Sequence, residues 1–281
     1  MKTCGEWPIA LCSWSLTRKV GDKMVPLSVD EIGSVMNALG LEYINLAIGP
    51  ALDPVTGPAY LEAVRRQNWK ISAGMMAFDY EDYTTLDTIK ATGGIAPDDK
   101  WPASGEAFAK AAKIAAELGT KYIAMHVGFL NESDSAYAKK FFDRVRYLGD
   151  AAKDAGLTLL METGQETADD LLHFVETLNH ENVRLNLDPA NLILYNKDEP
   201  IPSVKKLAPY IRHVHIKDAI RTKTPGTWGQ EVTWGDGEVN SFAFLNALRS
   251  VGYQGCLAIE REAGEQRVTD IATAVRRLQA W

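Results

Sequence analysis

Short apolar runs alternate along the chain with longer stretches in which apolar residues recur every three or four positions. Runs of four to eight residues are typical of buried strands, and the helical spacing is typical of helices with one buried face. The pattern predicts eight strands, at 8–13, 42–48, 70–76, 121–127, 157–161, 183–187, 211–216 and 256–260. It predicts helices at 28–39, 57–67, 104–118, 134–155, 167–179, 202–208, 240–250 and 265–280.

The order of these elements indicates the fold class. Strands that alternate with helices indicate a parallel sheet, because parallel neighbours need a helical crossover. We therefore expect an α/β fold, a (β/α)8 TIM barrel that forms a single domain over residues 1–281. A doubly wound open sheet is the competing fold, but it usually has a glycine-rich phosphate turn after an early strand. The chain contains no GxGxxG motif, which favours the barrel.

The amino-acid composition limits which binding partners and which cellular compartment the protein is expected to have. A length of 281 residues with 46% hydrophobic and 24% charged residues is ordinary for a soluble barrel domain. The net charge of −7 disfavours broad binding to nucleic-acid phosphates. Three cysteines without metal-type spacing, no leader-like N-terminal segment and no membrane-length apolar stretch predict a cytoplasmic protein without a membrane partner.

Four polar residues end four successive apolar runs, and they are the candidate chemistry of the chain. Glu162 follows LTLLM, Asp188 follows VRLNL, His215 follows IRHV and Glu260 follows CLAI. Side chains alternate along a strand, and the four residues share one parity, with Leu187 among the neighbours that then face the helices. Three carboxylates and one imidazole favour one divalent ion, Mn²⁺, Mg²⁺ or Co²⁺, with Zn²⁺ also possible.

Essentially the whole chain resembles the xylose-isomerase-like barrel superfamily, through METG, NLDPAN, HVHIKDAIR and AIERE. The similarity is to its sugar isomerase/epimerase branch, with ketose 3-epimerases of the D-tagatose 3-epimerase type. The resemblance implies that Glu162, Asp188, His215 and Glu260 hold one Mn²⁺-type ion. It implies that Glu162 and Glu260 also exchange protons with substrate carbon from opposite faces. It further implies that Arg221, six residues after His215, binds a substrate oxygen.

Four further residues are candidates for contact with substrate. The branch often has a histidine three residues after the strand-six aspartate, where this chain has Asn191, which can donate a hydrogen bond but cannot become cationic. His126 either bonds substrate or is a polar rim residue. Trp14 either forms a wall of a sugar pocket or packs in the core. Gln165 either reaches substrate hydroxyls or only precedes a helix cap.

Three neighbours of His215 have structural interpretations beside the functional ones. His213 lies one layer below it in the predicted barrel, where we expect a buried histidine paired with Asn186. Lys217 and Asp218 follow His215 directly. Asp218 either orients a neighbouring ligand or forms a surface ion pair with Lys217, which would contribute little stability.

The residues and the resemblance together predict a metal-dependent sugar isomerase or epimerase that acts on a small sugar or polyol. Its reaction would move a proton next to a carbonyl through a metal-bound enediolate. A keto-sugar or keto-inositol dehydratase or lyase is the alternative, because the same intermediate can expel an adjacent leaving group. An abasic-site DNA endonuclease would need a basic groove and more histidines than the five present, and a non-catalytic binding barrel is a fourth interpretation. The sequence leaves open the substrate, its phosphorylation state and the oligomer, with a homodimer or a tetramer as candidates.

Overall fold

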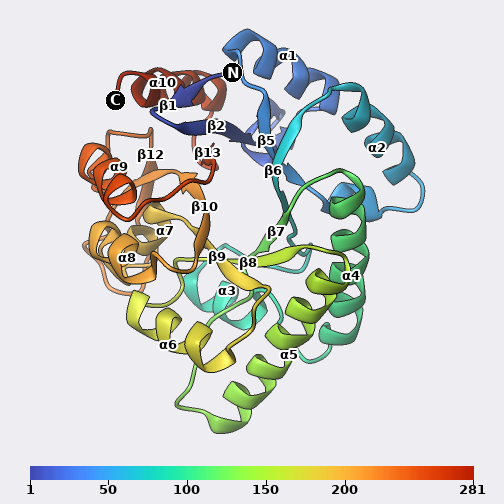
Figure 1. Cartoon of the computed structure of the whole chain (residues 1–281), viewed down its shortest axis with the longest axis vertical. Helices are drawn as coiled ribbons and strands as arrows, with labels where there is room; N and C mark the ends of the chain where they lie inside the picture. Colours follow the sequence, from blue (N-terminus) through green and yellow to red (C-terminus); the bar gives the residue numbers. More distant parts are fainter.

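A closed ring of parallel strands surrounded by helices forms the centre of the protein (Figure 1). The computed structural model describes residues 1–281. The ring runs in the order β2 (Trp7–Cys12), β5 (Tyr43–Ala47), β6 (Lys70–Met75), β7 (Tyr122–Met125), β8 (Thr158–Glu162), β9 (Val183–Leu187), β10 (Ile211–Ile216) and β13 (Leu257–Ile259). β13 pairs in parallel with β2, with Leu257 opposite Ile9, and this pairing closes the barrel. The predicted eight-stranded barrel is confirmed.

Helices follow the strands and cover the outside of the ring, as Figure 1 shows. Capping residues begin several of them: Ser28 accepts a hydrogen bond from the Glu31 N–H, and the Glu31 carboxylate accepts one from the Ser28 N–H, which is a capping box. The outer helices are α1 (Val29–Leu39), α2 (Gly57–Arg66), α4 (Trp101–Glu117), α5 (Ser135–Asp154), α6 (Ala168–Leu178), α8 (Pro200–Leu207), α9 (Ser241–Ser250) and α10 (Arg267–Gln279).

Several short elements in the connections were absent from the prediction, because each is too short to show a period. Most of them follow the C-terminal ends of barrel strands. They are β1 (Thr3–Cys4), η1 (Ser13–Ser15), the hairpin β3 (Thr17–Val20) and β4 (Lys23–Pro26), η2 (Gly49–Leu52), α3 (Leu86–Thr92), α7 (Pro189–Leu194), β11 (Asp218–Ile220) and β12 (Gln230–Val232). The long predicted connections 77–103 and 217–239 therefore contain α3 and the β11–β12 pair.

The core has two layers, one on each side of the barrel wall. Leu187, Val214 and Ile259 belong to the large apolar layer that includes residues of the outer helices. Side chains of the opposite parity fill the inside in small clusters, among them Ala10, Cys12 and Ala258, and Met75, Ala124 and Leu160. The alternation expected from the sequence is therefore present, and it directs the strand-end residues of the same parity toward the barrel axis.

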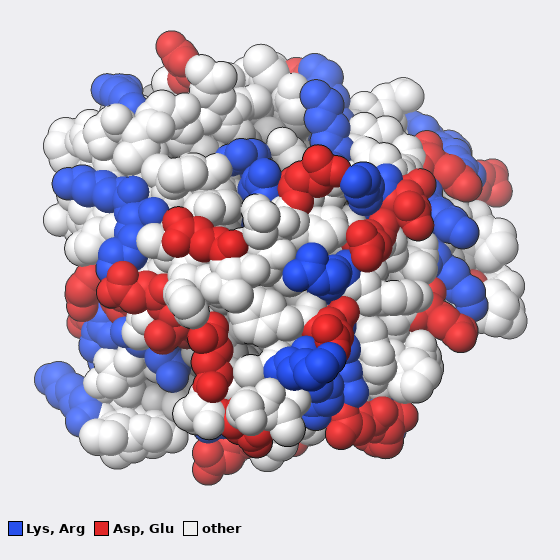
Figure 2. Space-filling model, turned by 60° about the horizontal axis from the view of Figure 1, so that its bottom comes forward, with Lys and Arg blue, Asp and Glu red and all other residues white.

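One face of the molecule shows how its surface charges are distributed. On the face drawn in Figure 2, basic and acidic side chains are interspersed. The whole chain carries a net charge of −7. None of its helices combines the length and the apolar character needed to cross a membrane.

Candidate metal centre and active-site cavity

The four strand-end residues come together at one end of the barrel. Glu162 ends β8, Asp188 follows β9, His215 lies in β10 and Glu260 follows β13, and these four strands are consecutive in the ring. One ligand atom from each residue lies within 4.8 Å of the ligand atoms of the others. All four side chains are buried. The site thus lies at the C-terminal end of the strands, where barrel enzymes place their chemistry.

His215 presents one ring nitrogen to the carboxylates and the other to the barrel interior. Its Nδ1 lies 3.1 Å from Glu162 Oε1, 3.3 Å from Glu260 Oε2 and 3.9 Å from Asp188 Oδ2. Its Nε2 lies 3.0 Å from Oδ1 of Asn45, a buried residue of β5. The ring is therefore oriented so that Nδ1 is the nitrogen available to an ion.

Asp188 has two separate tasks for its two carboxylate oxygens. Its Oδ1 accepts hydrogen bonds from the backbone N–H groups of Ala190 at 2.8 Å and Asn191 at 3.0 Å, which caps the N-terminus of α7. Its Oδ2 is buried and accepts no hydrogen bond. The cap fixes the carboxylate, so that Oδ2 is directed to the other three residues of the group.

Two buried carboxylate oxygens of this group accept no hydrogen bond, and they indicate whether the four residues fit an ion. Oε2 of Glu162, like Oδ2 of Asp188, is buried without a hydrogen-bond donor. A buried carboxylate oxygen is costly unless a cation or donor meets it. Three carboxylates and an imidazole supply the hard-to-borderline ligands that a divalent ion takes. The residues present therefore fit a divalent ion held by Glu162, Asp188, His215 and Glu260.

The charges in this group are strongly coupled. Burial would raise the pKa of Glu260, but Lys217 and His215 outweigh it and hold that pKa well below its usual range. Burial raises the pKa of Asp188 to about 8, with Lys217 opposing the rise and Glu260 and Glu162 adding to it. Burial would lower the pKa of His215, but Glu260 and other neighbours raise it well above its usual value. Two cations of the chain itself thus counterbalance the buried carboxylates.

Lys217 is part of the site, which corrects the interpretation of Lys217 and Asp218 as a surface ion pair. Its side chain is 4% exposed, and Nζ lies 2.9 Å from Glu260 Oε2, 2.7 Å from Glu262 Oε2 and 3.2 Å from Asn191 Oδ1. Asp218 does not contact a metal-site residue. Its carboxylate accepts hydrogen bonds from four backbone N–H groups, those of Ala219, Gly235, Gly237 and Val239, and so it holds the segment after β12 against β11.

A cavity of about 720 Å³ opens over the metal-site residues, and its lining includes Glu162 and Glu260. Loops after most of the strands form its walls, among them the segment after β2 that carries Trp14. The Trp14 indole N–H donates to Glu260 Oε1 at 2.7 Å, and its ring lies 5.9 Å from that of His215. Trp14 therefore both forms a wall of the cavity and orients Glu260.

Three of the five substrate contacts expected from the sequence line this cavity: Trp14, His126 and Asn191. His126 Nε2 lies 3.5 Å from Glu162 Oε2, and Asn191 Nδ2 donates to Glu162 Oε1 at 3.2 Å. Gln165 is buried outside the lining, with Nε2 3.4 Å from the hydroxyl of Tyr195. The structure therefore does not bring Gln165 to the cavity.

Arg221 also lies outside the cavity, contrary to the expectation from its spacing to His215. Its guanidinium donates to Asn196 Oδ1 at 2.9 Å, to the Asp198 carbonyl at 2.9 Å and to Glu199 Oε1 at 2.8 Å. Arg221 comes directly after β11, which pairs with β12 outside the barrel sheet. Arg221 therefore has the expected spacing to His215, but its side chain does not point into the cavity. Among lysine and arginine residues, Lys217 alone lines the cavity.

Some residues of the candidate site were given no role there from the sequence. They lie either on barrel strands or on irregular connections. Lys217 shares the parity of His215 two positions earlier, and this signal could have placed it inside the barrel. Asn45 lies on β5, where its inward parity alone does not separate it from a core residue. Tyr83 and Trp228 reach the cavity from irregular connections, which have no period to reveal a direction.

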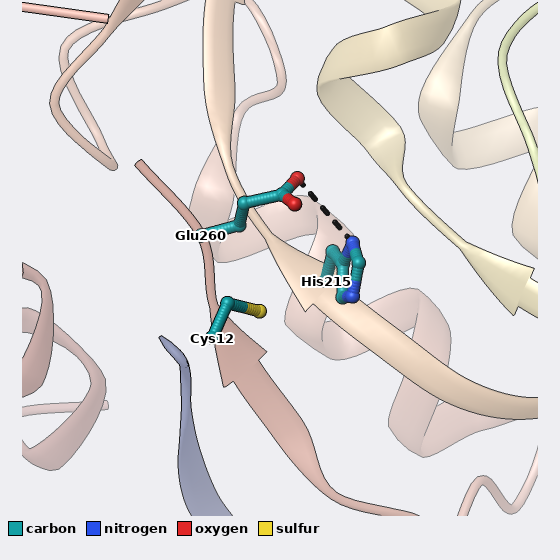
Figure 3. A group of neighbouring side chains, drawn as sticks. All are labelled: Cys12, His215 and Glu260. Atoms are coloured by element: carbon teal, nitrogen blue, oxygen red, sulfur yellow. Dashed lines mark ion pairs between the residues drawn. The ribbon is translucent and has the colours of Figure 1, made fainter. Parts of the chain in front are cut away.

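Below the metal-site residues, Cys12 completes a second group with His215 and Glu260 (Figure 3). Burial raises the pKa of the Cys12 thiol to about 12, although His215 opposes the rise. The thiol is fully buried and its Sγ lies 3.9 Å from Asn45 Oδ1. A protonated thiol is a poor metal ligand, so Cys12 acts as a small apolar residue of the barrel interior.

Comparison with known proteins identifies the family. The sequence model of the xylose isomerase-like TIM barrel family matches residues 29–281. The chain belongs to this family. The predicted resemblance to this family is confirmed.

Two curated relatives match only part of this xylose isomerase-like chain. The uncharacterised protein YihM of Escherichia coli strain K12 is 34% identical over 110 residues, which are 38% of this chain and 33% of YihM. Inosose dehydratase 1 of Bacillus cereus is 27% identical over 139 residues, 44% of this chain and 46% of that enzyme. The matched region thus spans between a third and a half of these relatives.

Solved structures match over nearly the whole chain. A xylose isomerase domain protein from Planctomyces limnophilus has a TM-score of 0.84 and 28% identity, covering 98% of this chain and 96% of its own. A xylose isomerase-like barrel from Mycobacterium smegmatis in complex with magnesium has a TM-score of 0.74 and 19% identity, covering 100% and 98%. An L-ribulose 3-epimerase has a TM-score of 0.67 and 18% identity, covering 95% and 86%. The last two likenesses show the fold alone.

Proposed function

We propose that this xylose isomerase-like barrel is a divalent-metal-dependent isomerase or epimerase of a keto sugar or related polyol. The observation that carries the proposal is the pair Glu162 and Glu260. Both carboxylates are buried, both line one cavity, and they enter it from β8 and β13, with β9 and β10 between them. A substrate carbon between them would have a proton acceptor on each face, which is the arrangement that epimerisation requires.

The ion has a limited and definite part in this proposal. Glu162, Asp188, His215 and Glu260 would hold it, with Mn²⁺ preferred and Co²⁺, Mg²⁺ or Zn²⁺ as alternatives. When bound, it supplies Lewis-acid stabilisation of the negative charge that develops beside the substrate carbonyl. Side chains of the protein accept and donate every proton that is transferred.

The two glutamates are prepared for proton transfer by different neighbours. Glu260 is held by the Trp14 N–H on Oε1 and by Lys217 on Oε2, at 2.7 and 2.9 Å. Glu162 accepts a hydrogen bond from Asn191 Nδ2 on Oε1, while its Oε2 accepts no hydrogen bond and lies 3.5 Å from His126 Nε2. Burial would raise the pKa of Glu162, but His126 and His215 bring it below its usual value. Both groups are therefore carboxylates that can accept a proton at neutral pH.

A dehydratase or lyase acting on a keto sugar or keto-inositol is the second candidate. The similarity to inosose dehydratase favours it, because that relative is named for loss of water. The same glutamate that removes a proton beside the carbonyl would begin such an elimination. The two candidates differ in the product: an epimer or isomer of equal mass, or an unsaturated compound that has lost water.

Deuterium incorporation from D₂O tests the proposed reaction. The protein with Mn²⁺ is incubated with a panel of ketoses and keto-glycosides, and mass spectrometry follows both exchange and loss of water. Glu162→Gln and Glu260→Gln should each lower exchange by about 10²–10⁴-fold, because each loses its proton acceptor. The matched control is Glu176→Gln, on the exposed face of α6. Full exchange in Glu260→Gln would refute the assignment.

A further inference from the structure

We propose that the cavity binds a neutral glycoside, in which the reacting keto sugar carries a second ring, rather than a free or phosphorylated ketose. This inference rests on the proposed function for the reacting ring and names the substrate class of the same site. Three independent properties of the cavity support it: its size, the charge of its lining, and a second group of aromatic side chains.

The first property is size. The cavity has a volume of about 720 Å³. Pockets of roughly 300–1,000 Å³ enclose most of the surface of a drug-sized ligand, and a monosaccharide is considerably smaller than such a ligand. A single sugar placed over Glu162 and Glu260 would therefore leave much of the cavity to solvent. A second ring would occupy part of this remaining space.

The second property is the charge of the lining. Beyond the two glutamates of the metal site, four acidic residues line the cavity: Asp53, Asp79, Glu231 and Glu262. The only lysine or arginine in the lining is Lys217, and its ammonium is already paired with Glu260 and Glu262. Outside the metal site, a phosphate or carboxylate would meet acidic groups without a free lysine or arginine to bind it. Hydroxyl groups, in contrast, can donate to the carboxylates.

Asp79 is the acidic residue best placed to test this idea. It lies on the connection after β6, across the ring from β10, whereas the metal-site residues lie on β8, β9, β10 and β13. No hydrogen bond or ion pair within the chain engages its carboxylate, and the residue is exposed to solvent. Its oxygens are thus available to hydroxyls of a ring that extends away from the metal-site half of the barrel.

The third property is a second aromatic group. Trp14 contacts Glu260 and lies beside His215, so it belongs to the subsite of the reacting ring. Tyr195 and Trp228 form a separate pair in the lining, edge to face with ring centres 4.7 Å apart. The Trp228 Nε1 is buried and has no hydrogen-bond partner in the chain. An aromatic surface of this kind in the lining suits the apolar face of a second sugar ring.

The experiment compares substrates that differ only in size or charge. The keto derivatives of methyl glucoside, maltose and cellobiose, oxidised at the same carbon, are compared by deuterium exchange with Mn²⁺ present, and fructose is compared with fructose phosphate. Calorimetry with the unoxidised glycosides measures binding without reaction. We expect kcat/KM for at least one keto-disaccharide to exceed that for the keto methyl glucoside by about tenfold, since each 1.4 kcal/mol of transition-state binding is a factor of ten. We expect fructose phosphate to react more slowly than fructose.

Asp79→Asn should reduce the advantage of the disaccharide, and Asp87→Asn, an exposed residue of α3 outside the lining, should leave it intact. Equal rates for the methyl glycoside and both disaccharides, or faster exchange of fructose phosphate, would overturn the inference. If no compound exchanges deuterium, the proposed reaction fails, and calorimetry decides the inference alone. Tighter binding of a disaccharide than of methyl glucoside would then support it, and equal or absent binding would refute it.

Discussion

His215 and Asn45 contact each other inside the barrel, with Nε2 of the imidazole 3.0 Å from Oδ1 of the amide. The orientation of this amide is fixed, because its Nδ2 donates to the Ala73 carbonyl at 2.8 Å. Oδ1 is therefore the atom directed at Nε2 of His215, which also lies 3.1 Å from Nδ2 of Asn186. The Nδ1 nitrogen is then the one that faces the carboxylates. Asn45, which is not itself a candidate ligand, therefore orients His215, which is one.

Replacing Asn45 should weaken metal binding without touching a ligand. Asn45→Leu removes the acceptor, and loss of such a partner of a metal-binding histidine typically lowers metal affinity by about 10–100-fold. Calorimetric titration of the metal-free protein with Mn²⁺ measures the change. Asn246→Leu, at a partly exposed position of α9, is the matched control. The same Mn²⁺ affinity in Asn45→Leu and in the unmodified protein would show that Asn45 does not orient His215.

Asp188→Asn should separate the two tasks of this side chain. Asparagine caps a helix about as well as aspartate, so α7 should be retained while the ligand oxygen that faces the metal site loses its charge. At a Mn²⁺ concentration about 100 times Kd, the unmodified protein should gain about 2.7 kcal/mol of stability. Thermal unfolding in Mn²⁺ and in EDTA measures this gain as the difference between the two conditions. The variant should show only a small part of it.

Asp134→Asn is the control for this experiment, because Asp134 caps α5 in the same way and lies away from the site. It should show the full Mn²⁺-induced increase in Tm. If Asp188→Asn shows the full increase as well, Asp188 does not hold the ion.

Lys217→Met should change stability and metal affinity in opposite directions. In EDTA, loss of the ammonium leaves buried carboxylates without their nearest cation, which should lower the free energy of unfolding by about 3–5 kcal/mol. Lys217 Nζ also lies 2.9 Å from Glu260 Oε2 and 3.5 Å from Asp188 Oδ2, so it competes with an ion for these oxygens. Mn²⁺ should therefore bind the variant more tightly.

Urea unfolding in EDTA and titration with Mn²⁺ measure the two effects of Lys217→Met. Lys110→Met, on the exposed surface of α4, should leave both unchanged. Weaker Mn²⁺ binding in Lys217→Met would contradict the competition and indicate that the ammonium supports the ligands instead.

The barrel and the four metal-site residues were accessible from the sequence for a common physical reason. Period-two alternation on a strand fixes the side of each residue, and parallel strands that close into a ring place all their C-terminal ends together. Glu162, Asp188, His215 and Glu260 therefore could be placed at one end of the barrel from the sequence alone. The same rule would have placed Lys217 beside them.

Residues on the connections could not be placed in this way. Arg221 has the spacing of a substrate-binding arginine, but β11 turns its side chain to Glu199. Trp228 lies between β11 and β12, in a connection whose path depends on distant contacts such as the hydrogen bond from the Gly229 N–H to the Leu194 carbonyl. No local pattern encodes such a path, because it arises from contacts between distant residues.

Glu166 provides a pH-dependent test of the structure next to the site. Burial raises the pKa of this carboxyl to about 8, with Asp170 adding to the rise and the Gly164 backbone N–H and Lys197 opposing it. The folded protein then keeps a proton on Glu166 at pH values where the unfolded chain has lost it. The free energy of unfolding should therefore fall as pH rises from about 4.5 to about 8, by a few kcal/mol, since a pKa difference of one between the two states corresponds to about 1.4 kcal/mol.

Glu166→Gln removes this titration, because a buried amide stays neutral throughout. In urea unfolding between pH 5 and pH 9 with EDTA present, the variant should lose less stability than the unmodified protein, so the difference between them should widen as pH rises. Glu176→Gln, exposed on α6, should follow the unmodified protein at every pH. A constant difference between Glu166→Gln and the unmodified protein would mean that Glu166 ionises in the folded protein as it does in the unfolded chain, despite its burial.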